Sequence, residues 1–402
     1  MAPSDVEFNP FLPEFIADPY PFYRRLRELD PVHRTGLGFW VLTRYDDVVA
    51  LLRDPRFGRE RYRELLQARF GDEAPSGGVS GSMLFRDPPD HTRLRALVNK
   101  AFTPRVVDAM RPHIQQIVDD LIDAVRDAKA MDVIADLAYP LPVTVICEML
   151  GVPVGERGEF RQWSVDIGRS LDAIAMPSDP TVIERGNVAR RALTDYFRTL
   201  AAERRARPRA DLLSALIAAE EQGDRLSEAE LLATCVLLFV AGHETTVNLI
   251  GNGLLALLRH PDALRSLRDD ASLIGGAVEE LLRYDGPVQR TGRIANTDVE
   301  LDGHKITEGT LVLGLIGAAN RDPAQFPEPD RLDFRRADNR HLAFGWGIHF
   351  CLGAPLARVE GQIALLTLAR RLPGLALAGS TPEWRESATL RGLRRLPVAW
   401  AG

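Results

Sequence analysis

An α+β fold, mainly α-helical with a small β portion, is predicted for this chain by three observations. Residues 104–207 follow a nearly continuous helical pattern. A second helical segment runs from 227 to about 259 and, at roughly 48 Å, is long enough to cross the whole molecule. Strand signals are concentrated near 33–43 and 289–313. The helices therefore form the bulk of the fold.

Length and composition are those of a globular protein. The chain has 402 residues, 45% of them hydrophobic, and a formal charge of −6. That charge argues against a nucleic-acid-binding protein, for which a basic face is expected. The length allows two domains, but we find no internal repeat and no linker that would separate them. We therefore expect one domain over residues 1–402.

Cysteine usage and hydropathy indicate a cytoplasmic protein without a membrane anchor. The chain has three cysteines, Cys147, Cys235 and Cys351, too few and too far apart for a disulfide framework or a zinc site. Residues 1–15 are acidic and contain prolines, unlike a signal peptide. The most apolar stretch, 231–242, is too short to span a membrane and is interpreted as part of a buried helix.

The first quarter of the chain alternates short elements. We expect a helix at 19–29, a strand at 39–43, where bulky residues gather, and a helix at 45–52. A glycine- and serine-rich stretch at 76–82 predicts a mobile loop. A turn then opens a helix near Asp90.

The last third carries most of the strand signals. We expect strands at 289–293, 299–301, 305–307 and 311–313. A long apolar-periodic segment at 354–372 predicts a helix that follows these strands.

The predicted central helix begins with a capping-box pattern, Ser227 and Glu230. Its middle carries Gly242, Glu244 and Thr245 in an otherwise apolar stretch. Glycine weakens a helix interior, and a threonine hydroxyl can bond a carbonyl one turn back, so a local opening is expected. The alternative is a packing glycine followed by back-bonded threonines. A buried carboxylate beside a hydroxyl favours a functional reason.

Glu280 and Arg283 are three residues apart on a predicted helix. Surface helices often carry such a pair, so alone it has little specificity. The proline-rich stretch 326–334 lies between this pair and a cysteine loop and could bring a second arginine, Arg331, to Glu280.

The segment Phe344–Gly353 places Cys351 just before the predicted helix at 354–372. Backbone N–H groups and the positive end of the helix dipole stabilise a thiolate at such a position. Taken alone, a single cysteine is more often a small buried apolar residue. The surrounding site decides between these interpretations.

Taken in order, these motifs resemble one family, the cytochrome P-450 haem-thiolate monooxygenases of the soluble bacterial kind. The resemblance runs from about Asp18 to Val398, and the cysteine loop matches the family's Phe-x-x-Gly-x-x-x-Cys-x-Gly pattern without departure. It implies the cytochrome P-450 fold, in which a long central helix lies over the haem. The cysteine loop and the helix after it lie beneath.

The resemblance also implies how haem b, an iron protoporphyrin IX, is held. Cys351 would be the axial iron ligand, whose thiolate pushes electron density onto the iron. The loop around it would be shaped by Phe344, Gly345, Gly347 and Gly353. A buried dianionic cofactor requires cationic or donor partners, and the residues that match the family's propionate partners are His91, Arg95, Arg293 and His349.

The resemblance also assigns roles to four positions of the central helix and to a network later in the chain. Ala241 and Gly242 would leave room for dioxygen over the iron, and Glu244 and Thr245 would form an acid–alcohol pair that relays protons. The structural Glu-Arg-Arg network of the family would be formed by Glu280, Arg283 and Arg331.

The implied reaction inserts one oxygen atom of O2 into a C–H bond or double bond of a hydrophobic molecule, such as a macrolide, terpenoid, steroid or fatty acyl group. Pocket walls would come from the helical region at 165–183 and from mostly apolar positions, each of which could equally be core. These positions are Met83, Leu84, Leu237, Val240, Ala241, Val288, Gln289, Thr389 and Leu390.

Electrons are expected from separate proteins, a ferredoxin and its reductase that draws on NAD(P)H, because no flavin or iron–sulfur segment is visible. Arg93, Lys100 and Arg340 could form a basic docking patch, with an ordinary solvated surface as the alternative. We expect a monomer. Two other functions stay open: a peroxide-driven haem enzyme, whose branch of the family lacks the acid–alcohol pair, and a non-catalytic haem or ligand carrier.

Overall fold

The computed structural model describes residues 7–71, 81–153, 160–174, 179–221, 226–379 and 382–401. Residues 76–80 of the predicted mobile loop at 76–82 lie outside the described residues.

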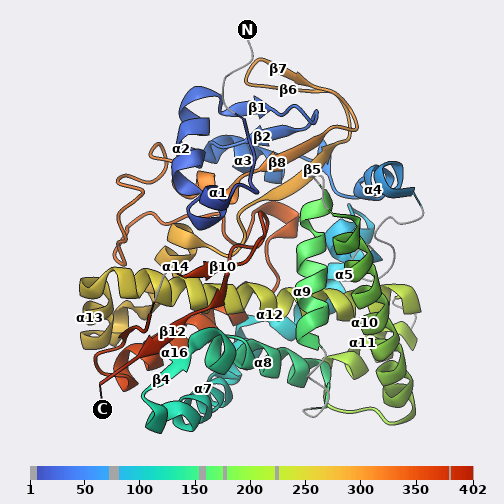
Figure 1. Cartoon of the computed structure of the whole chain (residues 1–402). Coiled ribbons are helices and arrows are strands. Elements are labelled where there is room, and N and C mark those ends of the chain that lie inside the picture. The colour runs from blue at the N-terminus through green and yellow to red at the C-terminus, as the bar shows by residue number, and fades with distance from the viewer. Residues whose placement is uncertain are drawn as a thin grey trace.

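The fold is organised around one long helix, α12 (Glu228–Arg259, 32 residues). It crosses the centre of the molecule in Figure 1. The predicted capping box is confirmed, since the Ser227 and Glu230 side chains each bond the other's backbone. By length and composition α12 could cross a membrane, but most of its apolar stretch is buried inside the protein. It is therefore the helix around which the core is built.

Helices pack against α12 along its whole length and form the largest hydrophobic cluster. Those in extensive contact with it are α8 (Pro140–Leu150), α10 (Pro180–Ala206), α14 (Ile274–Asp285) and α16 (Ala354–Arg371). The remaining helices are α1 (Pro13–Ala17), α2 (Tyr20–Leu29), α3 (Tyr45–Arg53), α4 (Tyr62–Phe70), α5 (Asp90–Asn99), α6 (Pro104–Ala109), α7 (Arg111–Val125), α9 (Phe160–Ser170), α11 (Leu212–Glu221), α13 (Pro261–Asp269) and α15 (Ile316–Ala319).

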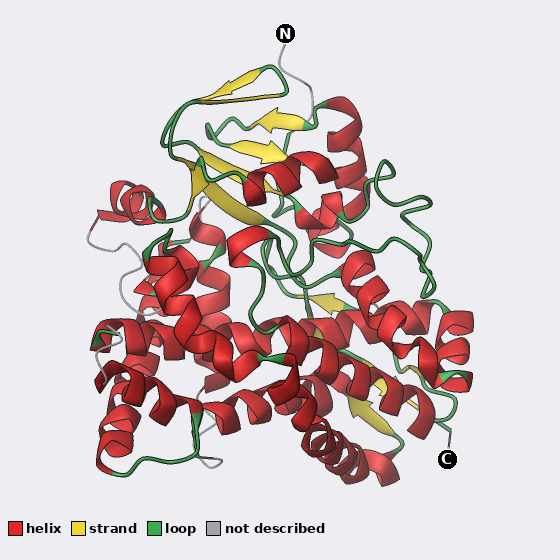
Figure 2. Ribbon diagram, turned by 180° about the vertical axis from the view of Figure 1, so that it is seen from behind, coloured by secondary structure: helices red, strands yellow, loops and turns green. Residues whose placement is uncertain are grey.

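A five-stranded sheet lies at one end of the molecule, above the helices in Figures 1 and 2. Its order is β1 (Val32–Arg34), β2 (Trp40–Leu42), β8 (Leu311–Gly314), β5 (Thr291–Ala295) and β3 (Phe57–Gly58). Only β2 and β8 pair in parallel. Neighbouring side chains on a strand point to opposite faces, so Trp40 and Leu42 join one hydrophobic cluster and Val41 joins another.

Smaller strand pairs complete the β portion. β6 (Val299–Leu301) and β7 (His304–Ile306) form a hairpin that confirms the predicted strands there, and β5 begins two residues later than expected. The sequence did not predict β3 or four short strands near the C-terminus and their partner. These are β4 (Ala130–Asp132), β9 (Ala376–Leu377), β10 (Glu383–Trp384), β11 (Leu393–Arg395) and β12 (Pro397–Ala399). The α+β fold predicted from the sequence is confirmed.

Candidate functional site

The cysteine loop is a tight turn that leads into α16. The Cys351 amide donates to the Phe344 carbonyl at 2.9 Å, and both Gly345 and Gly347 adopt φ +72°, a conformation that favours glycine. A Cβ at Gly347 would also lie 2.7 Å from the Leu52 carbonyl oxygen. Glycine at position 347 is therefore required both by its backbone angle and by its neighbour on α3.

Cys351 differs from the other two cysteines in its surroundings. Cys147 and Cys235 are buried, whereas Cys351 is exposed. Burial among protein atoms raises the pKa of the Cys351 thiol, and hydrogen bonds from the Gly353 and Ala354 amides act in the opposite direction, as the helix N-terminus predicts. Cys235, by contrast, has its pKa raised to about 12 by burial and stays a thiol.

Cationic and imidazole side chains gather next to this loop. The rings of His91 and His349 lie 4.3 Å apart, centroid to centroid, and Arg95 donates to the Ile348 and Phe350 carbonyls at 3.0 and 2.6 Å. Arg293 is only 3% exposed and donates to the Gly292 carbonyl at 2.8 Å. The structure thus brings together all four residues expected to hold haem propionates.

This cluster has a surplus of positive charge. Burial lowers the pKa of His349 far below its usual value, and Arg59 and Arg293 lower it further. Burial and Arg59 lower the pKa of Arg293 in the same way. Buried His91 Nδ1 and His349 Nε2 have no hydrogen-bond partner in the described structure. Unsatisfied buried polar groups and like charges are stabilised by an anionic partner, so the cluster fits a dianionic cofactor such as haem.

Arg59 is a member of this cluster that the sequence did not reveal. It follows β3, whose pairing with β5 puts Gly58 opposite Ile294 and so carries Arg59 to Arg293. Its guanidinium donates to Thr291 Oγ1 at 2.7 Å. No local pattern marks β3, a two-residue strand, so only the sheet pairing identifies this arginine.

The acid and the alcohol of α12 lie next to each other on a continuous helix. The Glu244 side chain is 5% exposed, and its Oε2 accepts from Arg385 Nη1 at 2.7 Å. Thr245 Oγ1 donates to the Ala241 carbonyl at 3.1 Å. The expected local opening is absent, because α12 remains α-helical throughout and the threonine hydroxyl bonds one turn back without breaking it.

The two small residues before them have different roles. Ala241 is exposed and Gly242 half-buried. A Cβ at Gly242 would come within 3.0 Å of Ile146 on α8. The missing side chain of Gly242 therefore permits close packing of α12 on α8, and its expected role beside dioxygen stays a prediction. Ala241 is the small residue on the accessible side.

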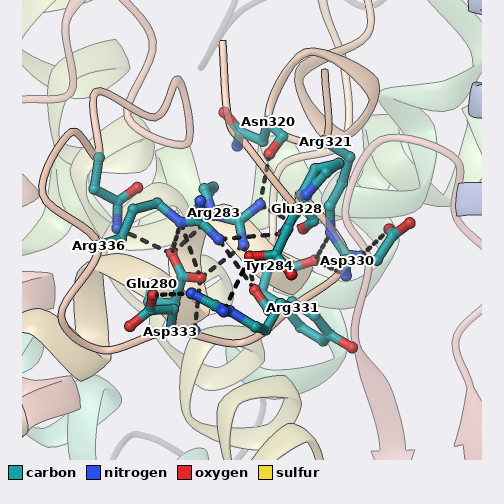
Figure 3. A network of polar contacts seen from close by, with 12 residues as sticks. Glu280, Arg283, Tyr284, Asn320, Arg321, Glu328, Asp330, Arg331, Asp333 and Arg336 are labelled. Atoms are coloured by element: carbon teal, nitrogen blue, oxygen red, sulfur yellow. Dashed lines mark hydrogen bonds and ion pairs between the residues drawn. The ribbon is translucent and has the colours of Figure 1, made fainter. Parts of the chain in front are cut away.

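The predicted scaffold around Glu280 forms, but with a different second arginine (Figure 3). Fully buried Glu280 accepts two hydrogen bonds from Arg283, at 2.7 and 2.8 Å, and is also bonded by Arg336 at 3.2 and 3.3 Å. Asn339 Nδ2 donates at 3.2 Å and the Asp333 amide at 2.9 Å. Each oxygen of this carboxylate therefore accepts from more than one donor.

The assignment of Arg331 to this network by its guanidinium was wrong. The Arg331 side chain is 58% exposed and bonds Glu328 and Asp333. Only its carbonyl joins the network, by accepting from Arg283 and Arg336 at 3.2 and 3.1 Å. The sequence signal that could have identified Arg336 is a spacing of three residues, because Asp333, Arg336 and Asn339 all bond Glu280.

The structure brings several predicted pocket segments together. Val288 and Leu390 form an isolated β-bridge, and the Gln289 amide donates to the Thr389 carbonyl at 2.9 Å. The segment 288–289 therefore lies against 389–390. On α9, a Cβ at Gly168 would contact Leu390 at 3.6 Å, which places part of the 165–183 region beside them.

The side chain of Gln289 is committed elsewhere. It accepts from the Tyr23 hydroxyl at 3.1 Å and donates to the Gly286 carbonyl at 2.8 Å. The amide of Gln289 therefore braces the N-terminal helix α2, and the place of Gln289 in the pocket wall stays a prediction. Of the other predicted wall residues, Met83, Leu237 and Val240 are each 7% exposed and Leu84 is half-buried, as expected for apolar packing positions.

An ion pair that the sequence did not predict ties these segments together. Buried Arg290 donates to Asp172 at 3.1 Å and to Thr389 Oγ1 at 3.0 Å. Asp172 also accepts from the Ala388 and Thr389 amides at 3.2 and 2.9 Å. The pair links the region after α9 to the C-terminal segment.

Comparison with known proteins places this site in context. The family model described as Cytochrome P450 matches residues 38–373. Cytochrome P450 monooxygenase PikC of Streptomyces venezuelae is 46% identical over 96% of this chain and 92% of its own length. The 6-deoxyerythronolide B hydroxylase of Saccharopolyspora erythraea is 42% identical over 96% of this chain and 97% of its own.

A solved structure is equally similar. Myxobacterial cytochrome P450 CYP267B1, in complex with myristic acid, superposes with a TM-score of 0.91 at 46% identity. The match covers 98% of this chain and 99% of the other.

Proposed function

This chain belongs to the cytochrome P450 family and is a monooxygenase, and we propose that its substrate is a hydrophobic small molecule, oxidised at a C–H bond or a double bond. The observation that carries the site assignment is the cluster of cationic and imidazole side chains beside accessible Cys351, in which two buried ring nitrogens have no partner in the described structure. A haem would be held by the Cys351 sulfur on the iron and by cationic partners on the propionates. These partners are Arg59, His91, Arg95, Arg293 and His349.

When bound, the haem activates dioxygen for insertion of one oxygen atom into the substrate. The chain's own residues supply the environment. The amides of Gly353 and Ala354 stabilise negative charge on the Cys351 sulfur. The Thr245 hydroxyl donates its hydrogen to the Ala241 carbonyl, so the lone pairs of Oγ1 are free to accept a proton that Glu244 supplies. When the hydroxyl releases the Ala241 carbonyl, it can pass its own hydrogen on.

The substrate class is proposed from the pocket walls and two relatives. The walls are apolar at Met83, Leu237, Val240 and Leu390. One relative is named for hydroxylation of 6-deoxyerythronolide B, and one neighbour was solved with myristic acid. We therefore propose a macrolide, terpenoid, steroid or fatty acyl substrate.

Electron delivery by a separate ferredoxin and reductase is part of the proposal, but the docking patch needs correction. Arg93 is paired with Asp90 and Glu230, and Arg340 with Asp338 at 2.7 Å. Pairing with carboxylates reduces their net attraction for an acidic partner, which leaves exposed Lys100 as the remaining cation of the three. The single domain, the monomeric state and the cytoplasmic location stay predictions from the sequence.

The test uses purified haem-loaded protein and a library of hydrophobic compounds. Compounds that shift the Soret band from low to high spin are incubated with a surrogate ferredoxin, its reductase and NADPH, or with peroxide alone. Oxygenated product in the first reaction supports the proposal. Product with peroxide alone would instead indicate a peroxygenase, and spin shifts without product in either reaction would indicate a ligand carrier.

Cys351→Ala is the matching variant for the ligand assignment. The reduced, carbon monoxide-bound protein should lose the absorption band typical of thiolate ligation, because no other accessible cysteine lies in the described structure. Cys235→Ala is the control and should keep that band. Persistence of the band in Cys351→Ala would show that another residue binds the iron.

A further inference from the structure

The two oxygens of the Glu244 carboxylate face different partners. Oε2 accepts a hydrogen bond from Arg385 Nη1 at 2.7 Å. Oε1 faces the ring of the preceding residue, with His243 Nε2 at 3.8 Å. Because the guanidinium donates to Oε2, a proton that binds Glu244 goes preferentially to Oε1.

The tautomer of His243 is determined by its other nitrogen. Nδ1 lies 2.7 Å from the Phe239 carbonyl oxygen, which can only accept, so Nδ1 carries the hydrogen. Nε2 of the neutral ring therefore presents a lone pair. His243 is fully buried, and Nε2 has no hydrogen-bond partner within the described residues. At 3.8 Å the two atoms are too far apart for a hydrogen bond, so Nε2 stays unsatisfied until a protonated carboxyl turns Oε1 toward it.

We propose that His243 and Arg385 are positioning residues for the proton on Glu244: Arg385 reserves Oε2, and His243 Nε2 accepts a hydrogen bond from protonated Oε1 once the carboxyl turns toward it. This inference rests on the proposed function, in which Glu244 supplies protons to Thr245. Neither residue was identified from the sequence, and His243 is otherwise an unexplained polar group in the apolar face of α12.

The proton balance is simple. Once the carboxyl has turned and Oε1 lies within hydrogen-bond distance of Nε2, the proton can move to Nε2, which converts a carboxylic acid and a neutral imidazole into a carboxylate and an imidazolium. The proton returns to Oε1 when Glu244 delivers it. Burial lowers the pKa of His243, which favours the return, and Glu244 acts in the opposite direction. The pair holds one proton close to the relay without a net change in charge.

The other polar groups near this pair are few. Tyr139, which precedes α8, interacts electrostatically with Glu244 and places its ring edge-on to His243, 6.0 Å away. Arg161 lies over the Tyr139 ring at 4.7 Å. Arg385, with 19% of its side chain exposed, is the nearest cation to the carboxylate. Its removal should therefore favour the protonated acid.

Infrared spectroscopy tests the proposal without substrate or turnover. At neutral pH, Arg385→Met should gain a protonated-carboxyl C=O band that Glu244→Gln, introduced into the same background, removes. Arg385→Lys should restore the wild-type spectrum. Adding His243→Asn to Arg385→Met should move the band to higher frequency, because the acid loses its acceptor. An unmoved band would overturn the role of His243, and no band in Arg385→Met would overturn that of Arg385.

Turnover gives a second readout. Asn at 243 can place its amide where Nδ1 lies and so keep the bond to Phe239, but it lacks Nε2. With a compound that shifts the Soret band, His243→Asn should form roughly three- to ten-fold less product per NADPH consumed, with an altered solvent isotope effect. The carbon monoxide band and thermal stability are the folding controls. Wild-type coupling in His243→Asn would contradict the proposal, whereas failure of the wild-type protein to turn over would count against the proposed function alone.

Discussion

Two buried glutamates of this protein, Glu280 and Glu244, are both paired with arginine but have opposite surroundings. Glu280 is bonded by Arg283, Arg336, Asn339 and a backbone amide, so its charge is fully compensated (Figure 3). Glu244 has one guanidinium on one oxygen and an acceptor facing the other. A saturated carboxylate has no capacity left for chemistry, so Glu280 serves the fold. A sparsely bonded one can exchange a proton.

The largest expected effect is at Glu280. Glu280→Gln should destabilise the protein by about 3–5 kcal/mol, because it leaves two buried guanidinium groups without their anion. Urea unfolding followed by helical circular dichroism measures the change. Glu244→Gln, treated identically, should lose far less stability. Similar losses at both sites would remove the distinction drawn between the two glutamates.

The second-largest expected effect is a difference in stability between variants of two nearby arginines, Arg336 and Arg331. Arg336→Ala should cost about 1–3 kcal/mol, since it removes buried hydrogen bonds to a charged group. Arg331→Ala should change stability little, because its guanidinium is solvated and bonds only surface carboxylates. The same urea titration compares them. A larger loss of stability in Arg331→Ala than in Arg336→Ala would restore Arg331 as the second arginine of the Glu280 network.

Thr245→Ala tests the chemical side of the comparison. The variant should bind haem and unfold like the wild type, because the lost hydroxyl bonds only a carbonyl of its own helix. Product per NADPH should fall, and hydrogen peroxide should rise in proportion, since proton delivery is impaired. Thr246→Ala is a neighbouring control. Unchanged coupling in Thr245→Ala would argue against an acid–alcohol relay.

The smallest effect concerns a third buried glutamate, Glu360 on α16. Neither of its oxygens has a hydrogen-bond partner in the described structure, and burial raises its pKa well above the usual value. Between the ordinary and the raised pKa the folded state binds more protons than the unfolded state, so stability falls as pH rises. In Glu360→Gln this fall of stability with pH should be absent, because glutamine does not titrate.

The measurement for Glu360 is urea unfolding of both proteins at about pH 5 and about pH 8. The stability of Glu360→Gln relative to the wild type should increase with pH. A difference that is independent of pH would mean that Glu360 is ionised in the folded protein. That result would place it closer to the compensated Glu280 than to an isolated acid.

The sequence alone determined the features that depend on neighbouring residues, namely two long helices, one helix start and the cysteine loop. The period of apolar residues predicted α12 and α16, the Ser227–Glu230 capping box predicted where α12 begins, and the glycine spacing predicted the cysteine loop. Each depends on residues a few positions apart, whose backbone preferences and side-chain contacts are established within one or two turns.

The tertiary structure decided which side chains meet. Arg385 lies 141 residues from Glu244, and Arg336 rather than Arg331 reaches Glu280 from an irregular segment. Arg59 joins the cationic cluster through a two-residue strand. In irregular segments no periodicity indicates which way a side chain points. The partner of each buried charge is therefore selected by the packing of distant segments, where an unpaired charge would cost the most.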